Sequence, residues 1–159
     1  MIDPVNFKVI GTIRSAHQDQ EKIPIQSVYA EGCRGQVHIF PEYEEGLKDI
    51  EGFSHLFLIY HFHCSGPADM LVCPFLQNEK RGVFATRTPR RPNPVGLSIV
   101  ELIRRDGNVL HIDNADILDG TPLLDIKPYI SRFDCIETSS CGWQDEVDDE
   151  TAERLGRRL

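Results

Sequence analysis

The sequence predicts a mainly-β fold, either a barrel or a sandwich, with helices at its periphery. Short segments rich in β-branched and aromatic residues alternate with turn residues along most of the chain. The regular alternation of strands and helices that a doubly wound sheet requires does not occur. With 159 residues and 18.1 kDa, the chain has the size of one domain with a full hydrophobic core.

Seven segments are predicted as strands, at residues 7–14, 36–40, 53–62, 82–86, 95–104, 108–113 and 125–130. In the first of them, Phe7, Val9 and Ile13 share one face. The third is almost entirely apolar or aromatic, which predicts a central strand buried on both faces. The pair Asp106-Gly107 favours a tight hairpin between the fifth and sixth strands. Pro128 lacks a backbone N–H and restricts the last strand to a sheet edge.

Helices are predicted at two places. Residues 42–50 form a short helix that ends before Gly52. Near the C-terminus, apolar and small residues recur every four positions and define one face of a helix; they are Val147, Thr151, Leu155 and Leu159. Acidic residues precede this helix and arginines end it, an order that complements the helix dipole.

Composition and terminal sequence exclude several classes of protein. Hydrophobic residues make up 40% and charged residues 26%, and no apolar run is long enough to cross a membrane. The first residues lack the basic and apolar regions of a signal peptide, which predicts a cytoplasmic location. The five cysteines are odd in number and form no CxxC pair, so we expect free thiols.

The charge distribution points to a local anion site. The net charge of −8 argues against a general nucleic-acid binder. Five of the 17 basic residues nevertheless fall in residues 80–91, where no acidic residue occurs. An acidic protein with one concentrated basic segment is typical of a confined site for an anion.

Residues 82–98 are the most informative segment. Arginines and prolines alternate between two predicted strands, and proline fixes the backbone that displays the arginines Arg87, Arg90 and Arg91. Stiffly held guanidinium groups suit a carboxylate or a phosphate. Asn93 precedes Pro94, so its side-chain amide is available to an amino group of a ligand. The alternative is a rigid surface turn with solvated arginines.

Two further segments have the residue types of a site. His61 and His63 alternate on one predicted strand. They could bind zinc with Cys73, His38 or an aspartate, contact a ligand without metal, or form an ordinary packed or hydrogen-bonded pair. Residues 119–122 form a turn with an exposed carboxylate and open backbone N–H groups, which could grip an amino acid or a ribose. The alternative for that turn is a plain connection to an edge strand.

Long motifs in this chain are those of a known family. They are residues 10–15, 53–56, 62–63, FATRTPRRPNPVGLS at 84–98 and DGTPLLDIKPY at 119–129. The chain resembles the TrmO (TsaA-like) family of S-adenosylmethionine-dependent tRNA methyltransferases over about residues 7–133. The resemblance implies a small single-domain β-barrel over residues 1–159, with short peripheral helices and a C-terminal extension at 134–159 that contains a helix.

The resemblance also implies the reaction. Members methylate the exocyclic amino nitrogen of threonylcarbamoyl-adenosine next to the anticodon of tRNA, and they are homodimers. Carried over by matching position, the residues that bind S-adenosylmethionine are Gln26, Ser27, His63, Cys64, Arg87, Leu102, Asp119, Gly120, Thr121 and Pro122. Ile25 and Phe75 stand where many bacterial members have arginines.

The chemistry of S-adenosylmethionine agrees with this set of residues. Arg87 suits its carboxylate, and Asp119 suits its ammonium group or its ribose. Methyl transfer is an in-line displacement that needs alignment more than a strong base. The residues expected to act on the acceptor are Asn93, Pro94, Lys127 and Tyr129, and those expected to contact RNA are Arg90 and Arg91.

Two other functions fit the sequence. The first is a non-catalytic module on the same barrel that binds RNA or a nucleotide, which the acidic net charge allows. The second is a metal-dependent hydrolase that uses His61 and His63.

Overall fold

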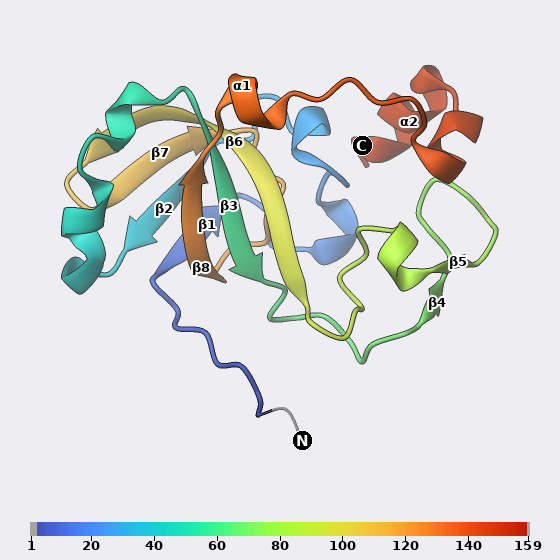
Figure 1. The fold of residues 1–159 in the computed structure, drawn as a ribbon, viewed down its shortest axis with the longest axis horizontal. Helices are drawn as coiled ribbons and strands as arrows, with labels where there is room; N and C mark the ends of the chain where they lie inside the picture. The colour runs from blue at the N-terminus through green and yellow to red at the C-terminus, as the bar shows by residue number, and fades with distance from the viewer. Residues whose placement is uncertain (1–2, 159) are drawn as a thin grey trace.

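The computed structural model describes residues 3–158 and shows a closed β-barrel (Figure 1). Its strands follow the order β1-β2-β7-β6-β3-β8, and each neighbouring pair is antiparallel. The strands are β1 (Gly11–Ser15), β2 (Gly35–Ile39), β3 (His55–His61), β6 (Val95–Asp106), β7 (Val109–Asp113) and β8 (Thr121–Pro128). A separate two-stranded sheet pairs β4 (Leu71–Val72) with β5 (Arg81–Gly82). The mainly-β prediction is confirmed, and the closed sheet is a barrel rather than a sandwich.

The barrel interior explains the burial pattern of β3. Leu56, Leu58 and Tyr60 point inward and are 0–4% exposed, whereas Phe57 and Ile59 are only half-buried on the outer face. The prediction of a strand buried on both faces is therefore wrong. A closed barrel has a single interior, so successive side chains alternate between core and outer surface even in a nearly all-apolar strand.

Two predicted strands differ in extent. β1 begins at Gly11 instead of residue 7, because its pairing with β2 and β8 begins there, with Gly11 opposite Ile39 and Leu123. Phe7 and Val9 are exposed, while Ile13 is fully buried. Residues 82–86 are not a strand either: after the short β5, the chain turns into a 3₁₀ helix at Val83–Ala85.

β8 is longer than predicted and is not an edge strand. It pairs with β1 through residues 121–123 and with β3 through residues 123–128. Pro128 lies opposite Leu56, in the part of β8 that has no β1 partner. The missing N–H of Pro128 therefore removes no hydrogen bond from the barrel.

The helical elements are short. The predicted helix at 42–50 is wrong in kind: two 3₁₀ helices, Pro41–Leu47 and Ile50–Gly52, are separated by Asp49 with φ of 68°. Gly52 lies inside the second of them instead of following a helix. The remaining helices are α1 (Ser131–Asp134), α2 (Asp149–Gly156) and 3₁₀ turns at Gln20–Lys22, Ser27–Tyr29 and Gly142–Glu146.

The C-terminal helix is confirmed by α2. The Asp148 side chain accepts a hydrogen bond from Thr151 N at 2.8 Å and caps its first turn, and Arg154 lies in the last turn. Thr151 and Leu155 are half-buried, as the predicted face requires, and Leu159 lies outside the described residues.

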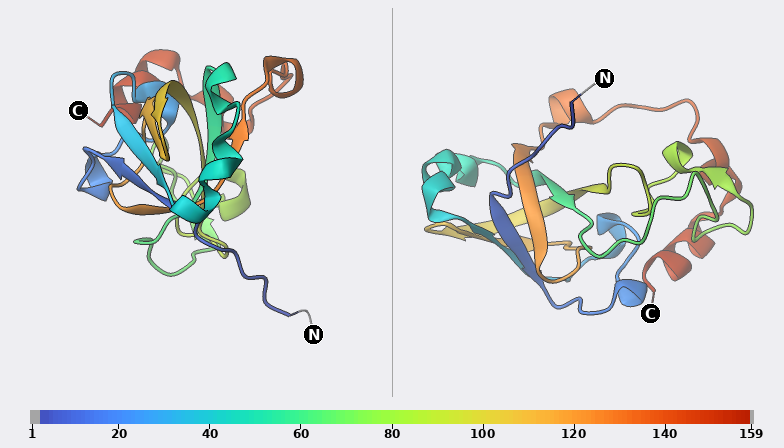
Figure 2. Two further views of the ribbon diagram at one scale, coloured as in Figure 1. Left: turned by 90° about the vertical axis from the view of Figure 1, so that its left-hand side faces the viewer. Right: turned by 90° about the horizontal axis from the view of Figure 1, so that it is seen from below.

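The connecting loops and α2 gather on one side of the barrel, away from the 3₁₀ helices at residues 41–52 (Figures 1 and 2). Hydrogen bonds fix this arrangement: Ile25 N donates to Gly156 O at 2.9 Å, and Arg158 Nη1 donates to Gln20 O at 2.8 Å. Trp143 Nε1 donates to Ala85 O at 2.8 Å. The C-terminal segment therefore braces both the loop after β1 and the loop before β6.

Within residues 3–158, no helix is long and apolar enough to span a membrane. The five cysteines are free, as predicted, and four of them are exposed.

Candidate functional site

The structure brings together two predicted cofactor residues that are far apart in sequence. Arg87 Nη1 donates a hydrogen bond to Gln26 Oε1 at 2.6 Å. Gln26 lies just before the 3₁₀ turn at Ser27–Tyr29, and its backbone carbonyl accepts from Tyr29 N at 3.0 Å. Arg87 is exposed, and in the part of the chain that the structure describes this is its one hydrogen bond. Most of its guanidinium donors are therefore available to an anionic ligand group.

The other arginines of the loop at 86–94 are used differently. Arg91 is half-buried, and its Nη1 donates to Thr86 O at 3.0 Å and Thr88 O at 3.2 Å. Arg91 therefore stiffens the loop that displays Arg87. Arg90 is exposed and donates only through Nε, to Pro67 O at 3.2 Å.

Asn93 and Pro94 hold the start of β6. Pro94 O accepts from Phe62 N at 2.8 Å, and Asn93 O accepts from Val95 N at 2.7 Å. Across the described residues 3–158, no hydrogen bond involves the exposed Asn93 side chain. The backbone therefore fixes the position of the Asn93 amide, while the amide itself forms no hydrogen bond that stabilises the turn.

His63 and Cys64 lie in a turn after β3, not on the strand. β3 ends at His61, and His63 and Cys64 are both exposed. The expectation that His61 and His63 share a strand face is therefore wrong. Cys64 O accepts from Gln20 Nε2 at 3.1 Å, which connects this turn to the loop that leads to Gln26. In residues 3–158, no group of three or more potential metal ligands occurs.

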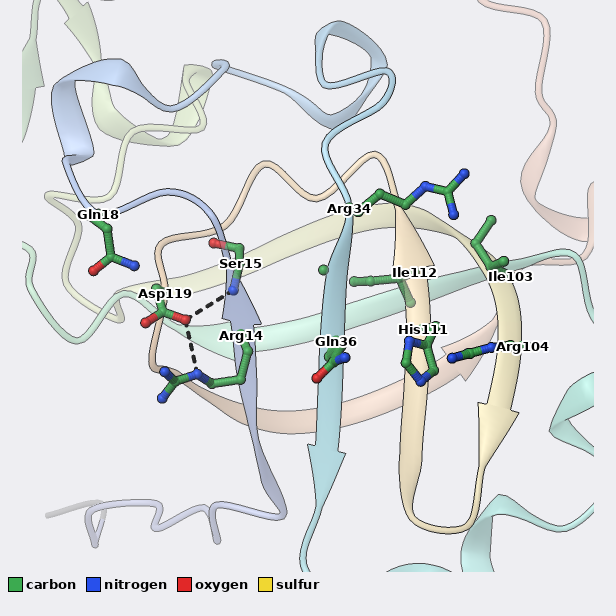
Figure 3. Close-up of a pocket in the computed structure, with 11 residues that line it drawn as sticks. Arg14, Ser15, Gln18, Arg34, Gln36, Ile103, Arg104, His111, Ile112 and Asp119 are labelled. Atoms are coloured by element: carbon green, nitrogen blue, oxygen red, sulfur yellow. Dashed lines mark hydrogen bonds and ion pairs between the residues drawn. The ribbon is translucent and has the colours of Figure 1, made fainter.

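The turn at 119–122 is a structural part of the barrel. The prediction that its N–H groups are open is wrong, because all three donate hydrogen bonds within the protein. Asp119 N donates to His17 O, Gly120 N to Ile13 O and Thr121 N to Leu118 O. The Asp119 carboxylate is occupied as well, because Oδ1 accepts from Ser15 N at 3.0 Å and pairs with Arg14 Nε at 3.1 Å (Figure 3). The physical reason is that β8 starts at Thr121 and pairs with β1 at once.

Hydrogen bonding also determines the ionisation of Asp119. Burial opposes its charged form, but bonds from Ser15 N–H and the Gln18 side chain and the charge of Arg14 together lower the pKa of Asp119. The role of residues 119–122 in cofactor binding stays a prediction.

Three predicted residues lie away from Arg87. Lys127 is opposite Phe57 near the start of β3, and its Nζ pairs with Asp125 Oδ2 at 3.0 Å. The Tyr129 ring packs on the Phe57 ring with centroids 5.5 Å apart. Leu102 N donates to Ser54 O, just before β3, whereas His63 follows the other end of that strand. Within one chain, these residues do not join the group around Gln26 and Arg87.

An open depression of about 450 Å³ lies on the outer face of β1, β2, β7 and β6 (Figure 3). Its arginines have carboxylate partners: Arg14 pairs with Asp119, Arg34 with Asp113 and Arg104 with Asp106. The charges therefore compensate each other, whereas within the described residues Arg87, Arg90 and Arg91 of the loop at 86–94 pair with no carboxylate.

Sequence reasoning did not single out Asp116 and Arg158. Asp116 lies between the buried Ala115 and Ile117, and one of its carboxylate oxygens is buried without a hydrogen-bond partner. Arg158 places its guanidinium 4.3 Å from the centroid of the Phe75 ring, a contact across the chain that no local pattern predicts.

Comparison with known proteins identifies the family. Residues 12–135 match the family model described as tRNA-methyltransferase O N-terminal domain. A Pyrococcus abyssi protein named "Probable S-adenosyl-L-methionine-binding protein" is 53% identical over 137 residues, which cover 86% of this chain and 74% of that protein. The Escherichia coli (strain K12) protein named tRNA (adenine(37)-N6)-methyltransferase is 34% identical over 147 residues, 86% of this chain and 63% of that protein.

Solved structures have the same fold. One described as "Crystal structure of TrmO" has a TM-score of 0.76 and 35% identity, and the match covers 88% of this chain and 64% of that one. Another, of TrmO from Pseudomonas aeruginosa, has a TM-score of 0.74 and 34% identity over 88% of this chain and 62% of that one. This chain thus spans less than two thirds of the length of these structures and of the Escherichia coli protein. By the family model and these relatives, the chain belongs to the tRNA-methyltransferase O family, whose N-terminal domain it contains.

Proposed function

We propose that this protein transfers a methyl group from S-adenosylmethionine to the exocyclic amino nitrogen of an adenosine next to the anticodon of tRNA. The observation that carries this proposal is the Arg87–Gln26 hydrogen bond, which unites two predicted cofactor residues beside the rigid Asn93-Pro94 turn. The names of the relatives support it, because one is called an S-adenosyl-L-methionine-binding protein and another a tRNA (adenine(37)-N6)-methyltransferase.

The residues present fit this cofactor. Arg87 is exposed and has free donors for a carboxylate, and Gln26 fixes the orientation of its guanidinium group. When bound, S-adenosylmethionine would supply a methyl group on a positively charged sulfur: the amino nitrogen would bond to the methyl carbon as the C–S bond breaks, and the sulfur would leave as the neutral thioether of S-adenosylhomocysteine. The protein needs to align the two reacting centres rather than to supply a strong base.

Asn93 is the residue proposed to align the acceptor. Its side-chain oxygen accepts a hydrogen bond from the target amino group and turns the nitrogen lone pair toward the methyl group. Pro92 and Pro94 restrict the backbone on both sides, and the Pro94 O–Phe62 N bond anchors the turn to the end of β3. The proton released on methylation passes to water, because the turn is exposed.

Nucleoside analysis tests the reaction in cells. We expect tRNA from a strain that lacks the gene to lose one methylated adenosine, and expression of this chain to restore it. Unchanged nucleosides in the deletion strain would contradict the proposal.

Two binding measurements separate the other functions. The non-catalytic module predicts RNA binding without affinity for S-adenosylmethionine in calorimetry. The hydrolase predicts a stoichiometric metal ion in elemental analysis of the purified protein. The proposal predicts S-adenosylmethionine binding that does not change when chelator is added.

RNA binding should depend on few phosphate contacts, because the net charge is −8 and only residues 80–91 concentrate basic residues, five of the 17, without an acidic one. For about three to four contacts, the slope of log affinity against log salt should be about −2 to −4. Arg90→Ala should lower RNA affinity and leave S-adenosylmethionine affinity unchanged, since only its Nε is engaged by the protein.

Arg104→Ala is the matched control, because this arginine lies on the outer face of β6 and pairs with Asp106 at 3.1 Å. A slope near −8, or equal losses of RNA affinity in both variants, would show that a broader surface binds the RNA. Arg91→Ala is less informative, because Arg91 supports two carbonyls of its own loop.

We propose that the protein is a homodimer through the outer face of β3 and β6. Phe57 pairs with Ile99 and Ile59 with Leu97 across these strands, and Leu97 is 57% exposed. A continuous apolar surface of this kind favours association. Tyr129 packs against Phe57, so a second copy on this face would bring Tyr129 and the nearby Lys127 to the interface.

Leu97→Asp should convert the dimer to a monomer in light scattering after size exclusion, because it buries a charge in the interface. Leu71→Asp is the control: Leu71 is 56% exposed but lies on β4, outside this face. A monomeric native protein, or a dimer that survives Leu97→Asp, would contradict this interface.

A further inference from the structure

Asp116 is a carboxylate in the loop between β7 and β8, and its backbone position is fixed by neighbouring residues. Its neighbours Ala115 and Ile117 are buried in the barrel core. Ala115 N donates to Cys33 O at 3.0 Å, and Ala115 O accepts from His17 Nε2 at 2.8 Å. Ile117 O accepts from Ser15 Oγ at 2.6 Å. The backbone is therefore held on both sides of Asp116.

The carboxylate of Asp116 is incompletely satisfied. Its Oδ1 has no contact with solvent and no hydrogen-bond partner in the described chain. The polar groups near it are the Ser98 hydroxyl on β6 and, through the 2.9 Å bond between Ser98 Oγ and Tyr60 OH, the phenol of β3. A buried acceptor without a donor is rare in native proteins and indicates a missing partner.

The surrounding charges favour a cationic partner. Arg87 is the cation near enough to influence Asp116, yet it forms no ion pair with it and donates to Gln26 instead. Burial raises the pKa of Asp116 to about 6, against the lowering effects of the Ser98 hydroxyl, its own backbone N–H and Arg87. Burial also raises the pKa of the neighbouring Tyr60 and Cys33, so both stay uncharged near neutral pH.

The relation between Asp116 and Arg87 matches the chemistry of an α-amino acid. In such a group, the carboxylate and the ammonium are attached to one carbon, so their binding partners must lie near each other. Arg87 has free donors for the carboxylate. Asp116 is only half-buried as a residue, so its carboxylate can be reached by an ammonium group although Oδ1 itself has no contact with solvent. Asp119, the other carboxylate considered for this role, already binds Ser15 N and Arg14.

We propose that the Asp116 carboxylate binds the α-ammonium group of the methionine portion of S-adenosylmethionine, next to the carboxylate held by Arg87. This inference rests on the proposed function and adds the residue that recognises the amino group. The ligand class is thus a zwitterionic amino-acid end, and Asp116 is a specificity-determining residue for it.

Binding of three nucleosides tests the inference. S-adenosylmethionine and S-adenosylhomocysteine both carry the α-ammonium group, and 5′-methylthioadenosine lacks it. Asp116→Asn removes the charge and keeps the shape, so it should weaken binding of the first two by the same factor, at least about tenfold, and leave the third unchanged. Asp106→Asn, at the β6–β7 hairpin, is the control with the same change of charge and should bind all three as the native protein does.

The outcomes distinguish a failure of the proposed function from a failure of the assignment of Asp116 to the ammonium group. If native protein binds none of the three, the proposed function fails and this inference with it. If S-adenosylmethionine binds and Asp116→Asn leaves its affinity unchanged, only this inference fails. Weakening of S-adenosylmethionine alone would show that Asp116 contacts the sulfonium, and would likewise overturn the assignment to the ammonium.

Stability tests separately whether the Asp116 carboxylate lacks a cationic partner in the ligand-free protein. Because the pKa of Asp116 is raised in the folded protein, the unfolded chain binds fewer protons, and stability is lost as the pH rises from about 4 through about 6. Asp116→Asn should therefore melt about 2–4 °C above native protein at pH 7.5 without ligand, and the gap should close below about pH 4. A lower melting temperature of the variant at pH 7.5 would contradict the inference.

Discussion

Arg87→Ala is expected to weaken S-adenosylmethionine binding by about 2–4 kcal/mol, the scale for removing one partner of a desolvated charge pair. The reason is that Arg87 is displayed by a loop stiffened by three prolines and by Arg91, with its guanidinium oriented by Gln26. Arg87→Lys should recover only part of the affinity, because an ammonium group cannot bind a carboxylate through two parallel hydrogen bonds. Calorimetry measures both effects.

Arg90→Ala is the matched control for this prediction, as an exposed arginine of the same loop. Its affinity for S-adenosylmethionine should equal that of native protein. The melting temperature of Arg87→Ala should change little, since Arg87 forms one protein hydrogen bond in the described chain. Native affinity in folded Arg87→Ala would remove Arg87 from the cofactor site.

Asn93→Ala should reduce kcat by roughly 10²-fold, with little change in affinity for S-adenosylmethionine. The interaction proposed for Asn93 matters most when the amino nitrogen attacks, so its loss raises the barrier more than it weakens ground-state binding. The Asn93 side chain forms no hydrogen bond within residues 3–158, so its removal should not destabilise the turn. Single-turnover rates and melting temperature on one preparation test both statements.

Asn78→Ala, the same substitution in another exposed loop, is the control and should leave rate and stability unchanged. If Asn93 served only the backbone of its turn, Asn93→Ala would lower stability by about 1 kcal/mol with a normal rate. That result would remove Asn93 from the catalytic centre.

The strands of the barrel were predictable because their signals are local. β2, β6 and β7 lie close to the predicted segments, since alternating burial and the Asp106-Gly107 turn act within a few residues. Closure of the barrel could not be predicted from local signals, because β8 pairs with β1 across more than a hundred residues of sequence. This pairing extends β8 back to Thr121. β1 and β3 flank β8, so the edge strand predicted there was wrong for the same reason, although Pro128 itself lies where β8 has no β1 partner.

The candidate site was predictable only in part. The motif at 84–98 identified Arg87, and the structure adds its partner Gln26 from a distant loop. The turn at 119–122 has the composition of a ligand-binding loop, but its N–H groups and the Asp119 carboxylate hold β1 and β8 together. Asp116 was not identified, because its importance depends on burial and on the lack of a partner, which composition does not reveal.

The C-terminal segment shows a further limit of local patterns. The acidic start and basic end of α2 predicted a helix, and nothing in them predicted its contacts. Arg158 stacks on Phe75, and Gly156 O accepts from Ile25 N. In this chain a cation from the C-terminal segment therefore lies beside Phe75, and the same segment holds the backbone of Ile25.

The most direct test of the account is methyl transfer with purified components. The protein is incubated with S-adenosylmethionine carrying an isotope-labelled methyl group and with tRNA from a strain that lacks this methylation, and the tRNA is digested for nucleoside mass spectrometry. We expect the label on the exocyclic amino nitrogen of the adenosine next to the anticodon, and its loss in Asn93→Ala. Binding of S-adenosylmethionine without any labelled adenosine, or a label on another atom, would contradict the account.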